Sequence, residues 1–288
     1  MKSNILFLFI AAFLSVNFAS DKPAYKLFDK NGKEVSYKKM LKALNKADAV
    51  LIGELHNNPI SHWAELVITE DLAKMHPEGL TLGAEMFEAD NQLILDEYLK
   101  GYFPAKKFEA DARLWPNYKT DYKPLVEFAK EKKYRFVATN IPRRYASIVF
   151  KHGFNGLNKL SEEAKKYIAP LPPEYDAKLK CYSDMIEAGK QMGDTCGYYP
   201  KAQAIKDATM AYFILKNIEP GKIFIHYNGA YHSDNYESIV WYLKRKKPDL
   251  KILTVTTVEQ KNIDVLNEEN KLKADYIFAV PESMTKTY

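Results

Sequence analysis

Short apolar runs and longer amphipathic segments alternate along most of the chain. The apolar runs predict buried strands over residues 49–54, 80–86, 134–140, 222–228, 250–258 and 276–280. Segments with a helical period lie between several of these runs and predict helices over residues 60–76, 91–101 and 122–133. Near-continuous apolar strands joined by helices indicate a parallel sheet that is covered on both faces. The pattern therefore predicts an α/β fold with a mostly parallel sheet and helices on both faces.

Two local signals precede the first predicted core strand. The sequence KLFDKNGKEVSY, residues 26–37, predicts two short strands around its Asn-Gly pair, which is the strongest short hairpin signal. The following segment, residues 37–47, places three apolar side chains on one face of a helix. We therefore expect a hairpin and a helix ahead of the core.

Residues 157–217 break the alternation of strands and helices. This segment has no strand pattern, contains the proline-rich sequence APLPPEY, and ends in residues 201–217 with a clear helical period. It predicts a helical insertion that sits over the sheet. We therefore expect a single α/β domain over residues 21–288, with this insertion over about residues 157–217.

The first twenty residues have the features of a secretory signal peptide. A lysine near the start is followed by an apolar run from Ile5 to Val16, and the small residues Ala19 and Ser20 precede Asp21. The run is short for a bilayer span, so we expect an exported protein that loses residues 1–20. Because no cysteine lies near the cleavage region, a lipid anchor through such a cysteine is not expected.

Composition and charge limit the classes of partner. The chain has 288 residues, of which 47% are apolar and 27% charged, which is ordinary for a globular protein. Its net charge of +5 comes mostly from scattered lysines, so a nucleic-acid partner is not expected. The 20 tyrosines stand out more, because a tyrosine combines a flat ring with an oxygen that can ligate ferric iron.

The chain has two cysteines, Cys181 and Cys196. An exported location permits a disulfide between them, and we expect one. The alternative is two separate thiols that simply pack. A thiolate metal site would need more ligands than this segment supplies, since no histidine lies between the two.

Polar side chains follow the predicted core strands at the points where the strands end. They are Glu54, His56, Glu85, Glu88, Asn140, His226, Asn228 and, a little further on, His232. In open parallel sheets ligands bind outside the carboxyl ends of the strands. Singly, each residue could cap a helix or satisfy a hydrogen bond. Together, several carboxylates and imidazoles at one edge cost desolvation and repulsion, which favours a functional use.

The chemistry of this set stays open between two possibilities. Histidine and glutamate could exchange protons with water or a substrate, or they could bind a metal ion. The spacing of Glu54 and His56 is not the helical H-E-x-x-H pattern of zinc proteases. No G-x-S-x-G, P-loop or G-x-G-x-x-G motif occurs, so serine hydrolases, nucleotide hydrolases and dinucleotide enzymes lose their usual signals.

Several of these sequences together resemble one known family. VLIGELHNN, LGAEMFEADNQLILDEYLKGYF, LWPNYKTDYKPLVEFAKEKKYRFVATNIPRR, AQAIKDATMAYFI and IHYNGAYHSD occur in the order seen in ChaN-like haem-binding uptake proteins, a branch of the Tiki, TraB and erythromycin esterase superfamily. The resemblance covers about residues 25–257. It implies an α/β core with a helical insertion, location in the bacterial periplasm or at the outer membrane, and haem binding. It also implies a dimer that holds two haems face to face, one per chain, and a receptor or transporter that exchanges haem with it.

The resemblance also implies a signature of two glutamates and a G-x-x-H. Glu54, Glu85 and the sequence from Gly229 to His232 fill these positions. Members are often lipoproteins, and the missing cysteine after the apolar run puts membrane anchoring in doubt.

For haem, the chain offers anionic iron donors and partners for the propionates. A tyrosine phenolate suits ferric iron, and we favour Tyr198, Tyr199 and Tyr182 because they lie near the expected disulfide, with Tyr198 as the iron ligand. Cationic or hydrogen-bonding partners for the propionates are Arg143, Arg144, Lys201 and histidines such as His226.

Two hypotheses from different classes follow. The first is an exported haem carrier in iron uptake, which is not an enzyme. The second is a hydrolase, esterase-like or metallopeptidase-like, in which Glu54, His56, Glu85 and His232 are catalytic, because relatives in the superfamily cleave esters or peptides with this signature. The family branch favours the carrier.

Overall fold

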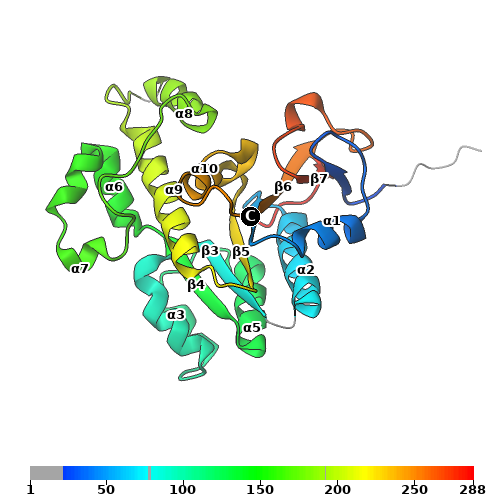
Figure 1. The fold of residues 1–288 in the computed structure, drawn as a ribbon, viewed down its shortest axis with the longest axis horizontal. Helices are drawn as coiled ribbons and strands as arrows, with labels where there is room; N and C mark the ends of the chain where they lie inside the picture. The colour runs from blue at the N-terminus through cyan, green and yellow to red at the C-terminus, as the bar shows by residue number, and fades with distance from the viewer. Residues whose placement is uncertain (1–21, 77–78, 192) are drawn as a thin grey trace, which may run out of the picture.

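A computed structural model describes residues 22–76, 79–191 and 193–288. The predicted signal peptide lies outside the described residues. The strands are β1 Lys26–Asp29, β2 Ala49–Glu54, β3 Leu80–Glu88, β4 Arg135–Asn140, β5 Ile223–Gly229, β6 Ile252–Gln260 and β7 Tyr276–Pro281. They form one seven-stranded sheet in the order β1-β7-β6-β2-β5-β3-β4 (Figure 1). Only β1 pairs antiparallel, with β7; the other pairs are parallel. The predicted α/β fold with a mostly parallel sheet is confirmed.

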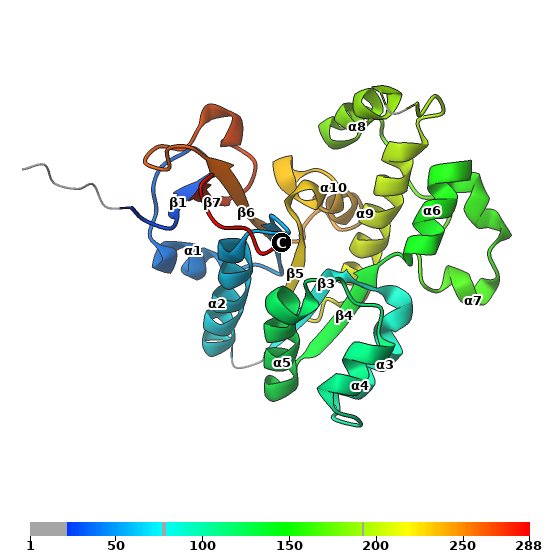
Figure 2. The same cartoon turned by 180° about the vertical axis from the view of Figure 1, so that it is seen from behind.

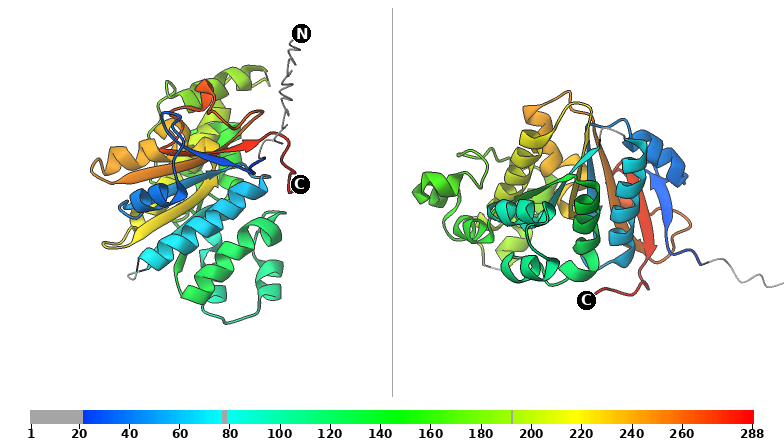
Figure 3. Two further views of the ribbon diagram at one scale, coloured as in Figure 1. Left: turned by 90° about the vertical axis from the view of Figure 1, so that its right-hand side faces the viewer. Right: turned by 90° about the horizontal axis from the view of Figure 1, so that it is seen from below.

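Helices cover both faces of the sheet. They are α1 Tyr37–Leu44, α2 Pro59–Met75, α3 Gln92–Leu99, α4 Ala105–Asp111, α5 Lys123–Lys132, α6 Arg143–His152, α7 Glu162–Lys165, α8 Lys180–Gln191, α9 Tyr198–Asn217 and α10 Ile239–Lys246. Alternate strand residues face opposite layers: Val50 and Ile52 pack with α1, α2 and α5, whereas Ala49 and Leu51 pack with α9 and α10. Figure 3 shows these two helical layers on either side of the sheet.

Both sides of the central strands are buried for this reason. Every residue of β2, β3 and β5 is buried, which accounts for the near-continuous apolar runs in the sequence. The strand β2 ends at Glu54, and Asn58 follows four residues later. The side-chain oxygen of Asn58 accepts hydrogen bonds from the backbone N–H groups of Ile60 and Ser61 and so caps α2, which has Pro59 in its first turn. The strand-to-helix turn thus lies at the carboxyl edge of the sheet.

The segment predicted as a helical insertion contains α7, α8 and α9. The long helix α9 packs directly on β3, β4 and β5, while α6 and α8 pack on α9 (Figure 2). This helix is therefore part of the layer that covers the sheet, and α7 and α8 lie outside it. None of the helices in the described part of the chain is long and apolar enough to cross a membrane.

The expected hairpin over residues 26–37 is formed only in part. Gly32 takes a positive φ of 82° and its N–H donates to the carbonyl of Asp29, so the turn is present. Beyond the turn, a single bridge between Phe28 and Glu34 replaces the second strand. The strand β1 pairs with β7 instead, because the edge of the sheet offers it a longer partner.

The expected disulfide is wrong. Cys181 is a buried thiol in the first turn of α8, and Cys196 is an exposed thiol beyond the other end of that helix. The N–H of Asp194 bonds the carbonyl of Gly189, which keeps the following chain at the far end of α8. A helix rises about 1.5 Å per residue, so the part of α8 that follows Cys181 separates the sulfurs by far more than a disulfide can bridge.

Candidate functional site

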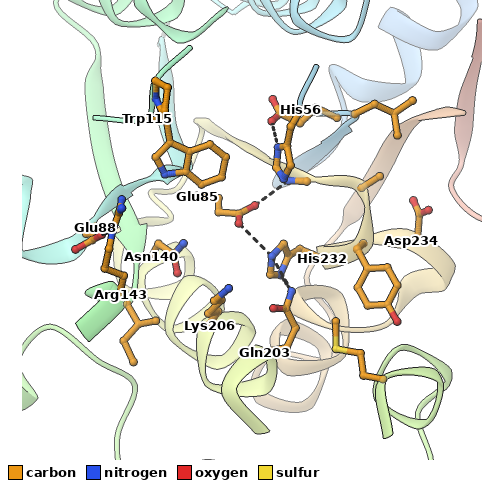
Figure 4. A pocket seen from close by; sticks show the side chains of 18 residues that line it. His56, Glu85, Glu88, Trp115, Asn140, Arg143, Gln203, Lys206, His232 and Asp234 are labelled. Carbon is orange, nitrogen blue, oxygen red and sulfur yellow. Dashed lines mark hydrogen bonds and ion pairs between the residues drawn. The ribbon is translucent and has the colours of Figure 1, made fainter. Parts of the chain in front are cut away.

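A cavity of about 790 Å³ opens at the carboxyl ends of the central strands (Figure 4). Its lining comes from the ends of β2, β3, β4 and β5, from α6, α8 and α9, and from the segment before α5: Glu54, Leu55, His56, Glu85, Glu88, Trp115, Pro116, Asn140, Ile141, Arg143, Met185, Gln203, Lys206, Gly229, Ala230, Tyr231, His232 and Asp234. A cavity of this size lies within the range of small-molecule and cofactor sites. The prediction that the strand-end residues line one crevice is confirmed for most of them.

Glu54 and His56 form the wall contributed by β2. The Glu54 carboxylate is fully buried; its Oε1 lies 2.5 Å from Nδ1 of His56 and accepts a 2.7 Å hydrogen bond from the hydroxyl of Tyr122. Burial and the neighbouring charge of Glu65 raise the pKa of Glu54 to about 8. Burial opposes the charged form of His56, but its hydrogen bond to Glu54 and the charges of Glu54 and Glu85 together outweigh burial and raise its pKa. The His56 ring, with 40% of its side chain exposed, is therefore the accessible proton-carrying group of this pair.

A second histidine of the cavity lies between two carboxylates. Nε2 of His232 is 3.2 Å from Oε1 of Glu85, and its Nδ1 forms a short ion pair with Oδ1 of Asp207. The other oxygens are also satisfied: Glu85 Oε2 accepts from the Gly229 N–H at 2.8 Å, and Asp207 Oδ2 accepts from the Tyr182 hydroxyl at 2.7 Å. We call these three residues the Glu85–His232–Asp207 cluster.

The electrostatics of this cluster keep the imidazole protonated. Burial lowers the pKa of His232, but the charges of Glu85 and Asp207 outweigh burial and raise it to about 10. The same interaction overcomes burial at Glu85 and lowers its pKa. At neutral pH this histidine is a fixed cation, so it can donate a proton or neutralise an anion but cannot act as a general base.

Gly229 allows the two halves of the site to approach. A Cβ at this position would lie 2.8 Å from Cε1 and 2.9 Å from Nε2 of His56, closer than real Cβ contacts. A side chain at this glycine of the G-x-x-H sequence would therefore displace the ring of His56. The short helical turn Ala230–His232 after β5 then aims His232 at Glu85.

Arginines and acidic residues form the outer rim. Glu88 is paired with both Arg113 and Arg143, and Asp90 is paired with Arg113 and Arg144. Arg143, expected as a propionate partner, does line the cavity, with most of its side chain exposed. Arg144 does not line the cavity.

The structure places five of the expected cofactor residues outside the cavity: Tyr182, Tyr198, Tyr199, Lys201 and His226. Tyr182 is fully buried and its hydroxyl donates to Asp207, so no face or oxygen of it can reach haem. Its expected role is wrong, because packing between α8 and α9 encloses the ring.

Tyr198 and Tyr199 lie at the start of α9, half-buried on its outer side. The Tyr198 ring packs against Gly153 and under the ammonium group of Lys201, 5.1 Å from the ring centre. The Tyr199 ring packs edge-on against Phe150. Neither tyrosine contacts the cavity within one chain, so Tyr198 as iron ligand and Lys201 as propionate partner stay predictions without a contact to it.

His226 is wrong as a cofactor residue. Its ring is fully buried inside the sheet, with Nε2 2.8 Å from the Thr139 hydroxyl and Nδ1 3.0 Å from Oδ1 of Asn228. Burial lowers its pKa to about 4, so the ring is neutral. It lies three residues before the end of β5, where Phe224, Thr139 and Asn228 enclose its ring below the floor of the cavity.

Residues that the sequence interpretation missed complete the site. Tyr231 lines the cavity with 42% of its surface exposed, and its hydroxyl donates to the carbonyl of Cys181 at 2.7 Å. It lies within the G-x-x-H sequence itself, which was a usable signal. Trp115 and Lys206 also line the cavity. Asp207 gave no signal, because a single acidic residue in an amphipathic helix usually faces solvent.

Comparisons with known proteins agree with this architecture. A structure that describes cofacial haem binding to ChaN of Campylobacter jejuni is similar with a TM-score of 0.67 and 18% sequence identity, over 88% of this chain and 96% of that chain. A mutant of erythromycin esterase EreC in its open conformation is similar with a TM-score of 0.54 and 10% identity, over 92% and 98% of the two chains. At such identities these likenesses show the fold. A search of curated proteins by sequence finds no match.

The family match is made at the level of sequence. The model described as "Haem-binding uptake, Tiki superfamily, ChaN" matches residues 40–243, which is more than half of the chain and includes the strand-end residues of the cavity. The chain therefore belongs to the ChaN family of haem-binding uptake proteins in the Tiki superfamily.

Proposed function

We propose that this protein is an exported haem carrier in iron uptake that binds haem in the cavity at the carboxyl ends of the strands. The observation that carries the proposal is the composition of the cavity wall. Trp115, Ile141 and Met185 offer apolar surface to a flat macrocycle, and Arg143 and Lys206 offer positive charge to its propionates. The family of the chain and the cofacial haem described for ChaN of Campylobacter jejuni support the same ligand.

Haem would supply a ferric iron that needs an anionic donor, and the residues of the cavity fit this need. Among the tyrosines of the described residues, Tyr231 is the one that lines the cavity, so it joins Tyr198 and Tyr199 as a candidate for the iron. Burial raises the pKa of Tyr231 to about 12, so its proton would leave only when iron takes the oxygen. Its hydroxyl now donates to the carbonyl of Cys181, and a water molecule can donate to that carbonyl in its place.

A dimer with one haem per chain is the second part of the proposal. A haem that leaves one face at the open mouth of the cavity exposes apolar surface, and stacking two such haems between chains removes it. Tyr198 and Tyr199, which lie outside the cavity, are available for a contact from a second copy. The periplasm or outer membrane as its location, and a receptor or transporter as its partner, belong to the same proposal.

The observation that favours the alternative, a hydrolase, is the convergence of Glu54, His56, Glu85 and His232. His56 is accessible and hydrogen-bonded to a carboxylate, as a general acid or base must be. Against it, His232 is held as an imidazolium by Glu85 and Asp207 and has no free nitrogen for a substrate. We therefore keep hydrolysis as the second candidate.

A haemin titration of the full mature chain, followed by absorption spectroscopy, tests the carrier. We expect saturation near one haem per chain and a charge-transfer band typical of phenolate-ligated ferric haem. Tyr231→Phe should abolish that band although some haem still adheres, whereas Tyr102→Phe, on a tyrosine exposed away from the cavity, should not. Tyr198→Phe and Tyr199→Phe test the other two candidates.

Four results would contradict parts of this proposal or establish the alternative. If micromolar haemin causes no spectral change, the protein is not a haem carrier. If the charge-transfer band is unchanged in all three Tyr→Phe variants, tyrosine does not ligate the iron. Sedimentation with and without haemin tests the dimer, which an unchanged haem-bound monomer would contradict. Turnover of ester or peptide substrates that Glu54→Gln abolishes would establish the hydrolase.

A further inference from the structure

A third histidine and two carboxylates meet behind the cavity wall. Glu54 ends β2, and His62 and Glu65 lie three residues apart on one face of the first turns of α2. Their side chains are 0%, 6% and 0% exposed. One donor atom from each residue lies within 4.8 Å of the other two. We call this set the Glu54–His62–Glu65 cluster.

The hydrogen bonds around His62 determine what the ring presents to the carboxylates. Its Nε2 lies 3.0 Å from the backbone carbonyl of His56, and because a carbonyl only accepts, Nε2 carries a proton. In the neutral ring Nδ1 then presents a lone pair. That atom is 3.1 Å from Oε2 of Glu65 and 3.3 Å from Oε2 of Glu54. Three acceptor atoms therefore face one another.

Two carboxylate oxygens of the cluster have no hydrogen-bond donor among the described residues. They are Oε2 of Glu54 and Oε1 of Glu65, both buried. A proton on Nδ1 of His62 would lie between Oε2 of Glu65 and Oε2 of Glu54 and would still leave Oε1 of Glu65 without a donor. Among the described residues no lysine or arginine pairs with either glutamate. Buried carboxylate oxygens without a donor are costly, and a cation between the two carboxylates would satisfy both.

We propose that Glu54, His62 and Glu65 bind a divalent transition-metal ion of the zinc class. With metal–ligand bonds of about 2.0–2.2 Å, neighbouring donors in tetrahedral or octahedral coordination are roughly 3.0–3.4 Å apart. The two donor separations at Nδ1, 3.1 and 3.3 Å, have these values. One imidazole with two carboxylates suits zinc, manganese or iron, whereas magnesium and calcium prefer oxygen ligands throughout.

The surroundings supply the outer contacts that such a site needs. A metal-bound histidine usually donates its second N–H to a carbonyl or carboxylate, and Nε2 of His62 has the His56 carbonyl at 3.0 Å and Oδ2 of Asp121 at 3.5 Å. Asn117 donates to both of these acceptors. On the other side, the Tyr122 hydroxyl donates to Oε1 of Glu54, which fixes the carboxylate so that Oε2 points to His62.

The site lies behind the haem or substrate site and shares Glu54 with it. Oε1 of Glu54 faces His56 and the cavity, while Oε2 faces the cluster. An ion there would join the end of β2 to the start of α2 and fix the carboxylate against which His56 is oriented. Binding of this ion requires neither haem nor a hydrolysed substrate.

The first test uses the wild-type full mature chain without haem. After removal of metals with a chelator, the protein is titrated with Zn²⁺ by calorimetry and with Co²⁺ by visible absorption. We expect one ion per chain and cobalt d–d bands without a thiolate charge-transfer band. No saturable binding would overturn the proposal, and a thiolate band would assign the ion to a cysteine such as the exposed Cys196 and overturn it as well.

Matched variants locate the ion. Glu65→Gln and His62→Gln should each weaken zinc binding at least ~100-fold, more than the 10–100-fold cost of losing an outer contact, and Asp121→Asn should weaken it roughly 10-fold. Asp207→Asn removes an equally buried carboxylate from the other cluster and should keep wild-type affinity. If Glu65→Gln does not fold, Asp121→Asn decides in its place. Wild-type affinity in the Glu65, His62 and Asp121 variants, with loss in Glu85→Gln, would place the ion in the cavity and overturn the proposal.

Discussion

The Glu85–His232–Asp207 cluster and the Glu54–His62–Glu65 cluster contain the same groups, one histidine and two carboxylates. In the first, each ring nitrogen faces its own carboxylate and both carboxylates accept a further hydrogen bond. In the second, one nitrogen bonds a backbone carbonyl, the other faces both carboxylates, and two oxygens are left without donors. Composition alone therefore does not decide what such a cluster does.

The direction of the second ring nitrogen makes the difference. When it meets a carboxylate, a proton on the ring balances the charge and the cluster is complete. When the second nitrogen meets a carbonyl, as Nε2 of His62 does, its proton lies away from the carboxylates and does not balance their charge. Burial then raises the pKa of both Glu54 and Glu65 to about 8. The first cluster carries its own cation, and the second is arranged to take one from solution.

The largest expected effect comes from removing the cation of the complete cluster. His232→Leu leaves Glu85 and Asp207 buried without their partner, which should lower the free energy of unfolding by about 3–5 kcal/mol at pH 7. His62→Leu in metal-free protein should cost less, about 1–2 kcal/mol, because its carboxylates can hold their protons. Urea unfolding followed by tryptophan fluorescence measures both. Equal costs would contradict the distinction between the clusters.

Zinc should stabilise the folded protein by a smaller amount. At a free concentration of 100 Kd, linkage gives about 2.7 kcal/mol, which raises the melting temperature by roughly 5 °C for a chain of this length. The shift should persist in Asp207→Asn and disappear in Glu65→Gln. Differential scanning calorimetry with and without zinc gives the answer, and a shift that survives Glu65→Gln would count against the second cluster as its source.

A still smaller effect, of opposite sign, is expected from the same glutamate without metal. Glu65→Gln removes a buried acidic group whose Oε1 has no donor, so metal-free protein should gain about 1 kcal/mol of stability. Glu85→Gln should instead destabilise, because its carboxylate oxygens contact His232 and the Gly229 N–H. Parallel urea titrations of the two variants decide this, and a loss of stability in Glu65→Gln would argue that the glutamate has a structural role.

Sequence patterns predicted the elements that make the cavity but not the clusters. The apolar runs locate β2, β3, β4 and β5, and the rule that parallel strands bind ligands at their carboxyl ends then brings Glu54, Glu85 and His232 together. These predictions are correct because each needs only the residue pattern of a buried strand and the shared carboxyl edge of a parallel sheet. The family resemblance added the ligand, which no spacing in the sequence specifies.

What was missed depends on contacts between helices. Tyr182 and Asp207 meet only because α8 packs on α9, and both have ordinary surface interpretations in isolation. His62 and Glu65 occupy one face of α2, but their meaning comes from Glu54 on another element. The thiols failed to pair for the same reason, since the formation of α8 between them sets their separation.

The smallest expected effect concerns the protonation states of two histidines, His232 and His226. His232 has its pKa raised to about 10 by Glu85 and Asp207, and His226, six residues earlier, has its pKa lowered to about 4 by burial. The stability that His232 contributes should therefore be complete below pH 6.5 and be lost as the pH rises towards 10. That of His226 should be complete above pH 6.5 and be lost as the pH falls towards 4.

Nitrogen NMR of the imidazole rings measures these protons directly. At pH 8 one ring should still give the shifts of an imidazolium, and that signal should vanish in His232→Gln. At pH 5.5 another should remain neutral, with the pattern of a single tautomer, and vanish in His226→Gln. Because Gln203 also contacts the His232 ring, Gln203→Ala serves as the control and should leave the imidazolium in place, since its charge comes from the two carboxylates. A His232 ring that titrates near 6.5 would mean that Glu85 and Asp207 do not hold it as a cation, and the contrast between the two clusters would fail with it.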